Sequence, residues 1–205
     1  MKSYSQYGQD TYAYNNFFKG KKNGKFLEIG ADDGVTYSNT KFFEDLGWAG
    51  ICIEPRPNAF ELLTKNRKCI CENIALDNKE GEVEFLSIHG YGKGLSGIVD
   101  NYETKHWNRA NGQETKNSKK EIIKVKTHLL HNILENHNMN DIDFCSLDVE
   151  GSEMNILQTI DFNKTNIRVF TIENNYSDPK LRQFMTSQGY KFKGRVNIDD
   201  IYVKV

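Results

Sequence analysis

Three acid-rich segments of this chain each follow a short apolar run, and together they could build a binding site for a charged ligand. The first is 28–34 (EIGADDG), the second begins at Glu54, and the third is 148–153 (DVEGSE). An acid–amide pair, Glu173 and Asn174, follows a later apolar run. If these runs are strands of one parallel sheet, the side chains meet at the carboxyl edge, where such sheets bind ligands.

The first of these segments is a turn built around Gly30 and Gly34, which permit tight backbone turns and close approach of a ligand. Its spacing is not the G-x-G-x-x-G pattern of dinucleotide-binding loops, and Asp32 and Asp33 would repel a pyrophosphate. The acidic loop instead favours a ligand with ammonium and sulfonium charges, such as S-adenosylmethionine (SAM). Taken alone, the loop is equally compatible with an ordinary strand-to-helix turn that carries surface carboxylates.

The second segment adds a place for an adenosine. Glu54, followed by Pro55, lies 24 residues after Gly30, where an acid can accept hydrogen bonds from both ribose hydroxyls. A carboxylate at a helix start is the alternative, and the spacing favours ribose. The next apolar run leads to Asn73 and Ala75, which offer an amide and room for an adenine ring, a weak signal by itself.

The later acids could perform the chemistry. Asp148 and Glu150 lie beside the expected reaction centre, where either could take a proton from an acceptor hydroxyl. Asp148, Glu173 and Asn174 could instead form an all-oxygen site for Mg²⁺ or Mn²⁺. Acids that stabilise helix N-termini are the structural alternative. His89 is a second candidate base, with a solvated loop histidine as its alternative.

Residues 89–120 are rich in Gly, Asn and Lys, and we expect them to form a long loop on the substrate side. Tyr91 and Trp107 could stack on the apolar face of a sugar ring, or could anchor the loop by packing. Ser96 is expected to border the cofactor or the acceptor. Residues 1–23 are expected to be an N-terminal lid or a packing segment.

A sheet is needed to position these residues, and the apolar runs supply its strands. Strands are predicted at 25–29, 50–53, 69–76, 82–88, 121–126, 142–147, 168–172, 190–193 and 201–205, and helices at 10–18, 38–46, 58–66, 128–136, 152–160 and 179–188. This alternation predicts an α/β fold with a mostly parallel sheet and helices on both faces. The final hairpin adds an antiparallel strand near the C-terminus. We expect a single domain over residues 1–205.

The composition is that of an ordinary folded protein, with 205 residues, 38 % hydrophobic, 27 % charged and a formal net charge of −1. A near-neutral chain has no general attraction for nucleic acid or anionic membranes, and no apolar run approaches the length of a bilayer span. Cys52, Cys69, Cys71 and Cys145 lack the partners of a zinc site, so we expect free thiols in a reducing cytoplasm.

Four segments together resemble the FkbM-type methyltransferase family. They are 5–10 (SQYGQD), 26–34 (FLEIGADDG) with 38–40 (SNT), 47–50 (GWAG) with 53–57 (IEPRP), and 142–153 (IDFCSLDVEGSE). Each is unspecific alone, but their order and spacing match the family over most of the chain. The resemblance implies a SAM-dependent O-methyltransferase with the Rossmann-like, seven-stranded class I fold. Such enzymes commonly methylate hydroxyls of sugars or secondary metabolites.

The resemblance also implies roles for single residues. Glu28, Gly30 and Asp33 would contact the methionine part of SAM, Glu54 its ribose, and Asp148 would lie beside the methyl group. With the positions inferred from spacing, the expected cofactor set is Glu28, Gly30, Ala31, Asp33, Gly34, Asn39, Glu54, Pro55, Asn73, Ala75 and Asp148. Related sugar methyltransferases hold a divalent ion with acids after the same two strands, here Asp148, Glu173 and Asn174.

Two departures from the family leave the acceptor open. The chain has Thr127-His128-Leu129 where an Asp is common, and a Lys- and Asn-rich segment at 106–120. We expect methyl transfer to a hydroxyl, with a sugar of a glycan or glycoconjugate as acceptor. The alternatives are a non-sugar small molecule, nucleic acid, or a SAM-fold binding module without activity. The start of the chain close to its first motif is consistent with a module of a longer glycan-modifying protein.

Overall fold

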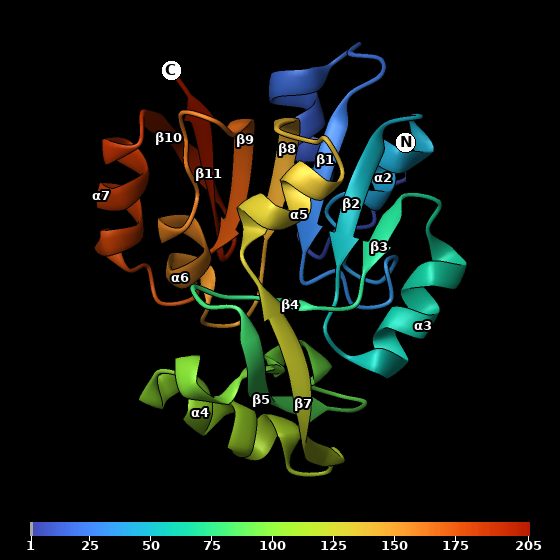
Figure 1. Cartoon of the computed structure of the whole chain (residues 1–205), viewed down its shortest axis with the longest axis vertical. Helices are drawn as coiled ribbons and strands as arrows, with labels where there is room; N and C mark the ends of the chain where they lie inside the picture. The colour runs from blue at the N-terminus through green and yellow to red at the C-terminus, as the bar shows by residue number, and fades with distance from the viewer. Residues whose placement is uncertain (1) are drawn as a thin grey trace.

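The computed structural model of the chain describes residues 2–205. A seven-stranded sheet forms its centre, and a four-stranded sheet lies beyond one end of it (Figure 1). The main sheet comprises β1 (Lys25–Ile29), β2 (Ala49–Ile53), β3 (Ile70–Glu72), β8 (Asp141–Leu147), β9 (Asn166–Glu173), β10 (Tyr190–Val196) and β11 (Asp199–Lys204). The order is β10-β11-β9-β8-β1-β2-β3, and β11 alone runs antiparallel to its neighbours. The predicted fold class is confirmed.

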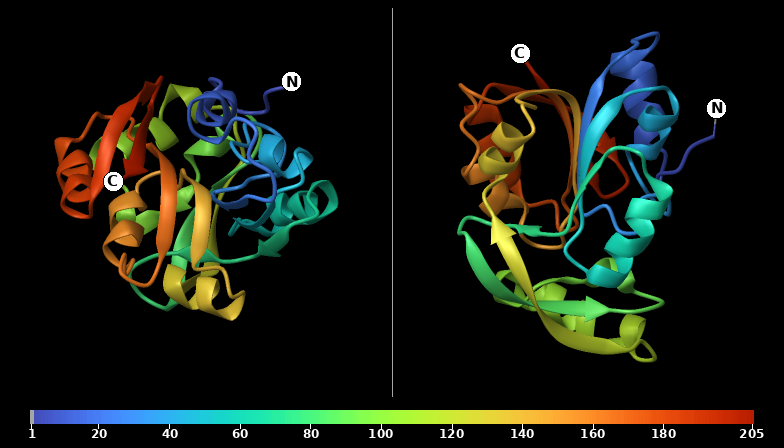
Figure 2. Two further views of the ribbon diagram at one scale, coloured as in Figure 1. Left: turned by 90° about the horizontal axis from the view of Figure 1, so that it is seen from above. Right: turned by 45° about the vertical axis from the view of Figure 1, so that its right-hand side comes forward.

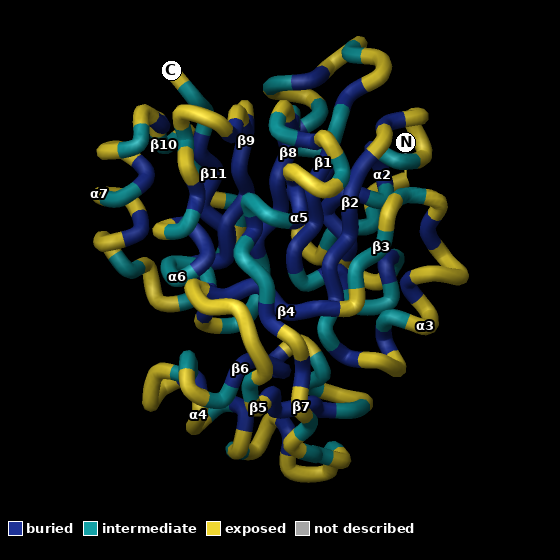
Figure 3. Tube along the Cα trace, viewed as in Figure 1, coloured by how far each residue is buried: buried dark blue, intermediate teal, exposed yellow. Residues whose placement is uncertain are grey.

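Helices cover both faces of this sheet (Figure 2). One face carries α1 (Gln9–Ala13) with the π-helical turn Tyr14–Phe18, α2 (Lys41–Asp45) and α3 (Pro57–Asn66), and the other carries α5 (Leu130–Asn136), α6 (Glu153–Gln158) and α7 (Pro179–Ser187). Alternate residues of β1 serve the two cores: Phe26 packs in the α1–α3 core, and Leu27 and Ile29 in the α5–α7 core. Buried residues accordingly concentrate in the central strands (Figure 3).

The second sheet is a feature that the sequence pattern did not predict. It comprises β4 (Ala75–Leu76), β5 (Gly81–Ile88), β6 (Gly97–Ile98) and β7 (Lys120–His128), with α4 (Thr104–Asn111) packed beside it. The single strand predicted at 69–76 is therefore wrong, because the chain leaves the main sheet after β3 and enters the second sheet at β4. Asn73 lies between these two strands, and its amide donates to the carbonyl oxygens of Glu54 (2.8 Å) and Pro55 (3.1 Å).

The segment 89–120 is also more ordered than a long loop. It contains α4, β6 and the 3₁₀ turns Lys93–Leu95, Val99–Asn101 and Gln113–Thr115. Ala110 of α4 packs in a small core with Leu86, Ile88 and Leu95. Few apolar residues are needed for this contact, so the polar composition of the segment concealed the helix.

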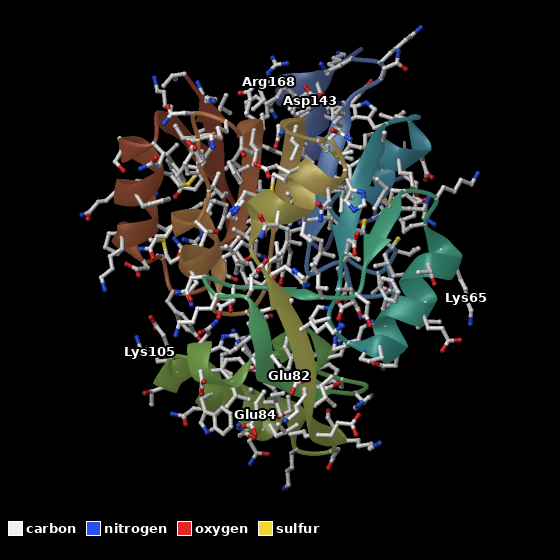
Figure 4. All side chains as sticks on the ribbon, in the orientation of Figure 1. Lys65, Glu82, Glu84, Lys105, Asp143 and Arg168 are labelled. Atoms are coloured by element: carbon white, nitrogen blue, oxygen red, sulfur yellow. The ribbon has the colours of Figure 1, made fainter. Side chains whose placement is uncertain are left out.

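The N-terminal segment packs on the main sheet. Phe18 is buried in the α1–α3 core, and Gln9 Nε2 donates to Asp199 Oδ2 (2.5 Å). Charged side chains such as Lys65 on α3, Glu84 on β5 and Lys105 on α4 stand on the outside (Figure 4). Among residues 2–205, no helix combines the length and apolar character that crossing a membrane requires.

Candidate active site

A cavity of about 530 Å³ lies between the carboxyl ends of the main strands and the second sheet. It opens where the strand order reverses, between β1 and β8, which is the usual place for a ligand in such sheets. Eleven of the residues predicted for the site line it: Glu28, Gly30, Ala31, Glu54, Pro55, Ala75, Tyr91, Ser96, Asp148, Glu150 and Glu173. The topology therefore brings most of the candidates together, and their individual roles stay predictions.

Four residues predicted to contact the cofactor lie outside the cavity. They are Asp33, Gly34, Asn39 and Asn73. Asp33 Oδ1 accepts from the backbone N–H groups of Val35 (2.9 Å) and Thr36 (2.7 Å), and Asn39 Nδ2 donates to Ser146 Oγ (2.9 Å). Gly34 has φ +78°, and a Cβ there would lie 2.6 Å from a Leu63 methyl group. Contact of these four residues with the cofactor stays a prediction, and in the structure they hold the loops that line the cavity.

The carboxylate of Glu28 is already fully engaged within the protein. It accepts hydrogen bonds from Ser38 Oγ (2.8 Å), Asn39 N (2.7 Å), Thr40 Oγ1 (2.7 Å) and Arg67 Nη1 (2.9 Å). These bonds use the acceptor sites that an ionised carboxylate offers. Glu28 therefore shapes the cofactor loop through its partners, and the Arg67 side chain, fully buried, supplies its counter-charge.

Glu54 retains more capacity for a ligand. Its Oε1 accepts from the backbone N and the Nε of Arg56 (both 2.9 Å), and its Oε2 from Asp32 N (2.8 Å). The Arg56 Nη2 also donates to Asp32 Oδ1 (2.8 Å). Glu54 Oε2 can still accept a hydroxyl. No role was predicted for Arg56, although its place two residues after the acid was a usable signal.

Three carboxylates converge in the floor of the cavity. One oxygen each of Asp148, Glu150 and Glu173 lies within 4.8 Å of the others. Burial, and then the charges of Asp199 and Glu153, raise the pKa of Asp148 to about 8. Burial and the charge of Asp148 hold the pKa values of Glu150 and Glu173 well above their usual range. The cluster therefore resists ionisation unless a cation joins it.

The composition of this cluster differs from the predicted metal set. Asn174 is not part of it, because its amide donates to Asp200 Oδ2 (3.0 Å) and accepts from Asp178 N (2.7 Å). Glu150 takes its place, and Glu150 Oε2 is buried without a hydrogen-bond partner. Three carboxylates with an unsatisfied oxygen are a donor set that fits a hard divalent ion.

His89 lies away from this cluster. Its Nε2 bonds to Glu121 Oε1 (2.8 Å), and it lines a second cavity of about 390 Å³ that adjoins the main one at Gly90, Tyr91 and Glu114. Trp107 also lies outside the main cavity and packs near Tyr102, with ring centroids 5.8 Å apart. The main cavity is therefore lined by neither His89 nor Trp107, and their roles as base and acceptor contact stay predictions.

A different histidine stands beside the acids. His106 of α4 is buried, and its Nε2 lies 3.2 Å from Glu150 Oε2 without forming a hydrogen bond, so that both buried atoms stay unpaired. Its ring stacks on Tyr102, with centroids 4.9 Å apart. Burial, and then the charge of Arg109, lower the pKa of His106 to about 4, so the ring is neutral at pH 7. The four-residue spacing of His106 and Ala110 on one helix face was the available signal.

The carboxyl cluster predicts an unusual pH dependence of stability. Because the folded pKa of Asp148 lies above its unfolded value of about 4, the stability present at low pH is lost as pH rises toward about 8. We expect the loss to be on the order of 5 kcal/mol in denaturant titrations without divalent ions. Asp148→Asn should flatten this slope, whereas Asp141→Asn, exposed on the same strand, should not. Equal slopes in all three proteins would contradict the prediction.

The strand order β10-β11-β9-β8-β1-β2-β3, with a cavity where this order reverses between β1 and β8, is that of the Rossmann-like methyltransferase class. The chain belongs to the methyltransferase FkbM domain family, whose model matches residues 28–192. It is therefore a SAM-dependent methyltransferase.

Comparison with other proteins adds solved structures of low sequence identity. No curated protein matches the chain. It is similar to a ΔN METTL16 MTase domain (TM-score 0.42, 12 % identity, 95 % of this chain and 78 % of that one). Human methyltransferase 10 domain containing protein gives the same four values. TrmK of M. capricolum, in complex with S-adenosylhomocysteine, has a TM-score of 0.39 and 12 % identity, over 89 % of this chain and 62 % of that one.

Proposed function

We propose that this protein is an O-methyltransferase that transfers the methyl group of SAM to a hydroxyl of a sugar in a glycan or glycoconjugate. The observation that carries the proposal is the cluster of Asp148, Glu150 and Glu173 in the cavity at the end of β8 and β9. A hydroxyl is a poor nucleophile until it loses its proton, so its methylation needs a base beside the acceptor.

Asp148 suits the role of this base. As the acceptor oxygen attacks, the new O–C bond forms, the S–C bond of SAM breaks, and the hydroxyl proton moves to a carboxylate oxygen. A base is most effective when its pKa lies near the working pH, and the pKa of about 8 at Asp148 meets that condition. The sulfonium supplies the leaving group, so the protein mainly aligns donor and acceptor.

A divalent ion is a second element of the proposal. Mg²⁺ or Mn²⁺ held by Asp148, Glu150 and Glu173 would lower the pKa of an acceptor hydroxyl bound to it. In either case Glu150 must be held in place, and it has φ +59°, a strained conformation for a residue with a side chain. His106 Nε2, 3.2 Å from Glu150 Oε2, packs beside this side chain.

Exposed aromatic rings at the cavity favour a sugar as the acceptor. Tyr91 and Tyr37 line the cavity although they are 83 % and 61 % exposed. Tyrosine rings stack on the apolar faces of pyranose rings and hydrogen-bond through their hydroxyls. The expected cytoplasmic location, and the place of the chain in a longer glycan-modifying protein, stay predictions.

A SAM-consumption assay tests the proposal. The chain is incubated with SAM and separate panels of oligosaccharides, catechol-type small molecules and RNA, with EDTA or with added Mg²⁺ or Mn²⁺. We expect S-adenosylhomocysteine to form with one or more oligosaccharides, and EDTA to reduce its formation at least about tenfold. Turnover of RNA or of the small molecules, with none on sugars, would contradict the assignment of the acceptor. A turnover rate that EDTA does not change would contradict the proposed role of a divalent ion.

A further inference from the structure

Three cysteines gather beneath the cofactor loop, away from the carboxylate cluster. The sulfurs of Cys52 on β2 and Cys69, just before β3, lie 3.5 Å apart, and Cys71 pairs with Cys52 across the two strands. Cys52 is fully buried, whereas Cys69 and Cys71 are partly exposed, and all three are free thiols. A disulfide requires a separation of about 2.05 Å, so a movement of roughly 1.5 Å would join Cys52 to Cys69.

The surroundings of Cys69 favour its reactive form. Side-chain hydrogen bonding with Cys52 and Cys71, aided by the nearby Arg67 guanidinium and opposed by burial, lowers the pKa of Cys69 to about 3. Burial raises the pKa of the Cys52 thiol, which therefore stays protonated. The pair thus combines a partly exposed thiolate with a neighbouring thiol, the arrangement found where a cysteine is oxidised and then resolved.

We propose that Cys69 is an oxidation site, and that hydroperoxides convert the Cys52–Cys69 pair into a disulfide that weakens cofactor binding. The Cys69 sulfur attacks the peroxide, an S–O bond forms, the O–O bond breaks, and the leaving oxygen departs as water or alcohol after taking up a proton. The Cys52 sulfur then attacks the Cys69 sulfur, so that the S–S bond forms and the S–O bond breaks. The Cys52 proton leaves with the hydroxide as water. The peroxide is reduced by the two electrons that the thiols lose.

The contacts of these cysteines lead directly to the cofactor loop. Cys52 Sγ lies 3.8 Å from Glu28 Oε2, which also accepts from Arg67 Nη1 (2.9 Å). Arg67 Nη1 donates in addition to Gly34 O (3.1 Å). Drawing Cys69 and Cys52 together therefore displaces the partners that hold both ends of this loop. The inference depends on the SAM cofactor, and it does not depend on which acceptor is methylated.

The test uses the full chain, hydrogen peroxide and S-adenosylhomocysteine. Reduced and peroxide-treated proteins are digested without reduction to map disulfides by mass spectrometry, and their affinity for S-adenosylhomocysteine is measured by calorimetry. After peroxide treatment we expect a Cys52–Cys69 disulfide and a loss of affinity of about tenfold. Dithiothreitol should reduce the disulfide and restore the affinity. These measurements need no acceptor, so a negative result here is distinct from failure of the proposed sugar methylation.

Matched variants separate the proposal from general oxidative damage. Cys69→Ser should keep its affinity after peroxide treatment, and Cys71→Ser should still form the disulfide and lose affinity. If Cys52→Ser does not fold, Cys52→Ala removes the same thiol from this buried position. A disulfide to Cys71, the absence of a disulfide, or an unchanged affinity in the oxidised wild-type protein would overturn the proposal.

Discussion

Asp148→Asn is expected to reduce methyl transfer by about 10³-fold while the protein stays folded and retains S-adenosylhomocysteine binding. The amide has nearly the shape of the carboxyl group but cannot take a proton from the acceptor, and general-base catalysis typically contributes 10²–10⁴-fold. Asp148 stands at the end of β8 in the floor of the cavity, within reach of Glu150 and Glu173. The measurement is the rate of S-adenosylhomocysteine formation with the acceptor found in the panel, at saturating SAM.

Two comparisons decide what Asp148 does. Asp141→Asn changes an exposed carboxylate at the opposite end of β8 and should leave the rate unchanged. If Asp148 acts as a metal ligand and not as a free base, the variant should also lose its response to added Mn²⁺. If Asp148→Asn keeps at least half of the wild-type rate, Asp148 is neither the base nor an essential metal ligand, and the acid cluster has a structural function.

The position of this acid could be predicted from the sequence because the main sheet obeys simple rules. The strand β1 was predicted with its observed bounds, and β2 and β8 to within one residue, since short apolar runs bounded by polar turns define buried parallel strands. Parallel strands bring their carboxyl ends to one edge, so the residues that follow them must meet. Glu54, Asp148 and Glu173 accordingly line one cavity, as the strand ends alone predict.

The rest depended on contacts that spacing does not encode. Asn174 follows Glu173, but the turn after β9 directs its amide to Asp200 and away from the acids. His106 reaches Glu150 from α4, which packs beside the second sheet, and that sheet forms because β5 pairs with β7 about 40 residues later. Long-range pairings of this kind are decided by packing, so a polar segment such as 89–120 gives little indication of them.

Gly30→Ala is expected to destabilise the protein by at least about 4 kcal/mol, or to prevent its folding. Gly30 follows β1 at φ +88°, and a Cβ there would overlap the carbonyl oxygen of Asp148. The backbone N–H groups of Gly30 and Ala31 both bond to Ile53 O (3.0 Å), so the loop cannot move aside without losing them. Strands β1, β2 and β8 are thus joined at this residue, and relief of the clash must displace Asp148 as well.

Gly47→Ala provides a matched control, because Gly47 has the same φ of +88° and an added Cβ would meet nothing within 4 Å. This variant should cost about 1 kcal/mol, which is the strain of the left-handed conformation alone. The difference between the two free energies of unfolding, measured by denaturant titration, isolates the contact with Asp148. If Gly30→Ala folds, its affinity for S-adenosylhomocysteine should also fall, whereas Gly47→Ala should bind normally. Equal costs for the two variants would mean that the β1 loop yields freely, and that the close approach of Gly30 to Asp148 does not set the geometry of the site.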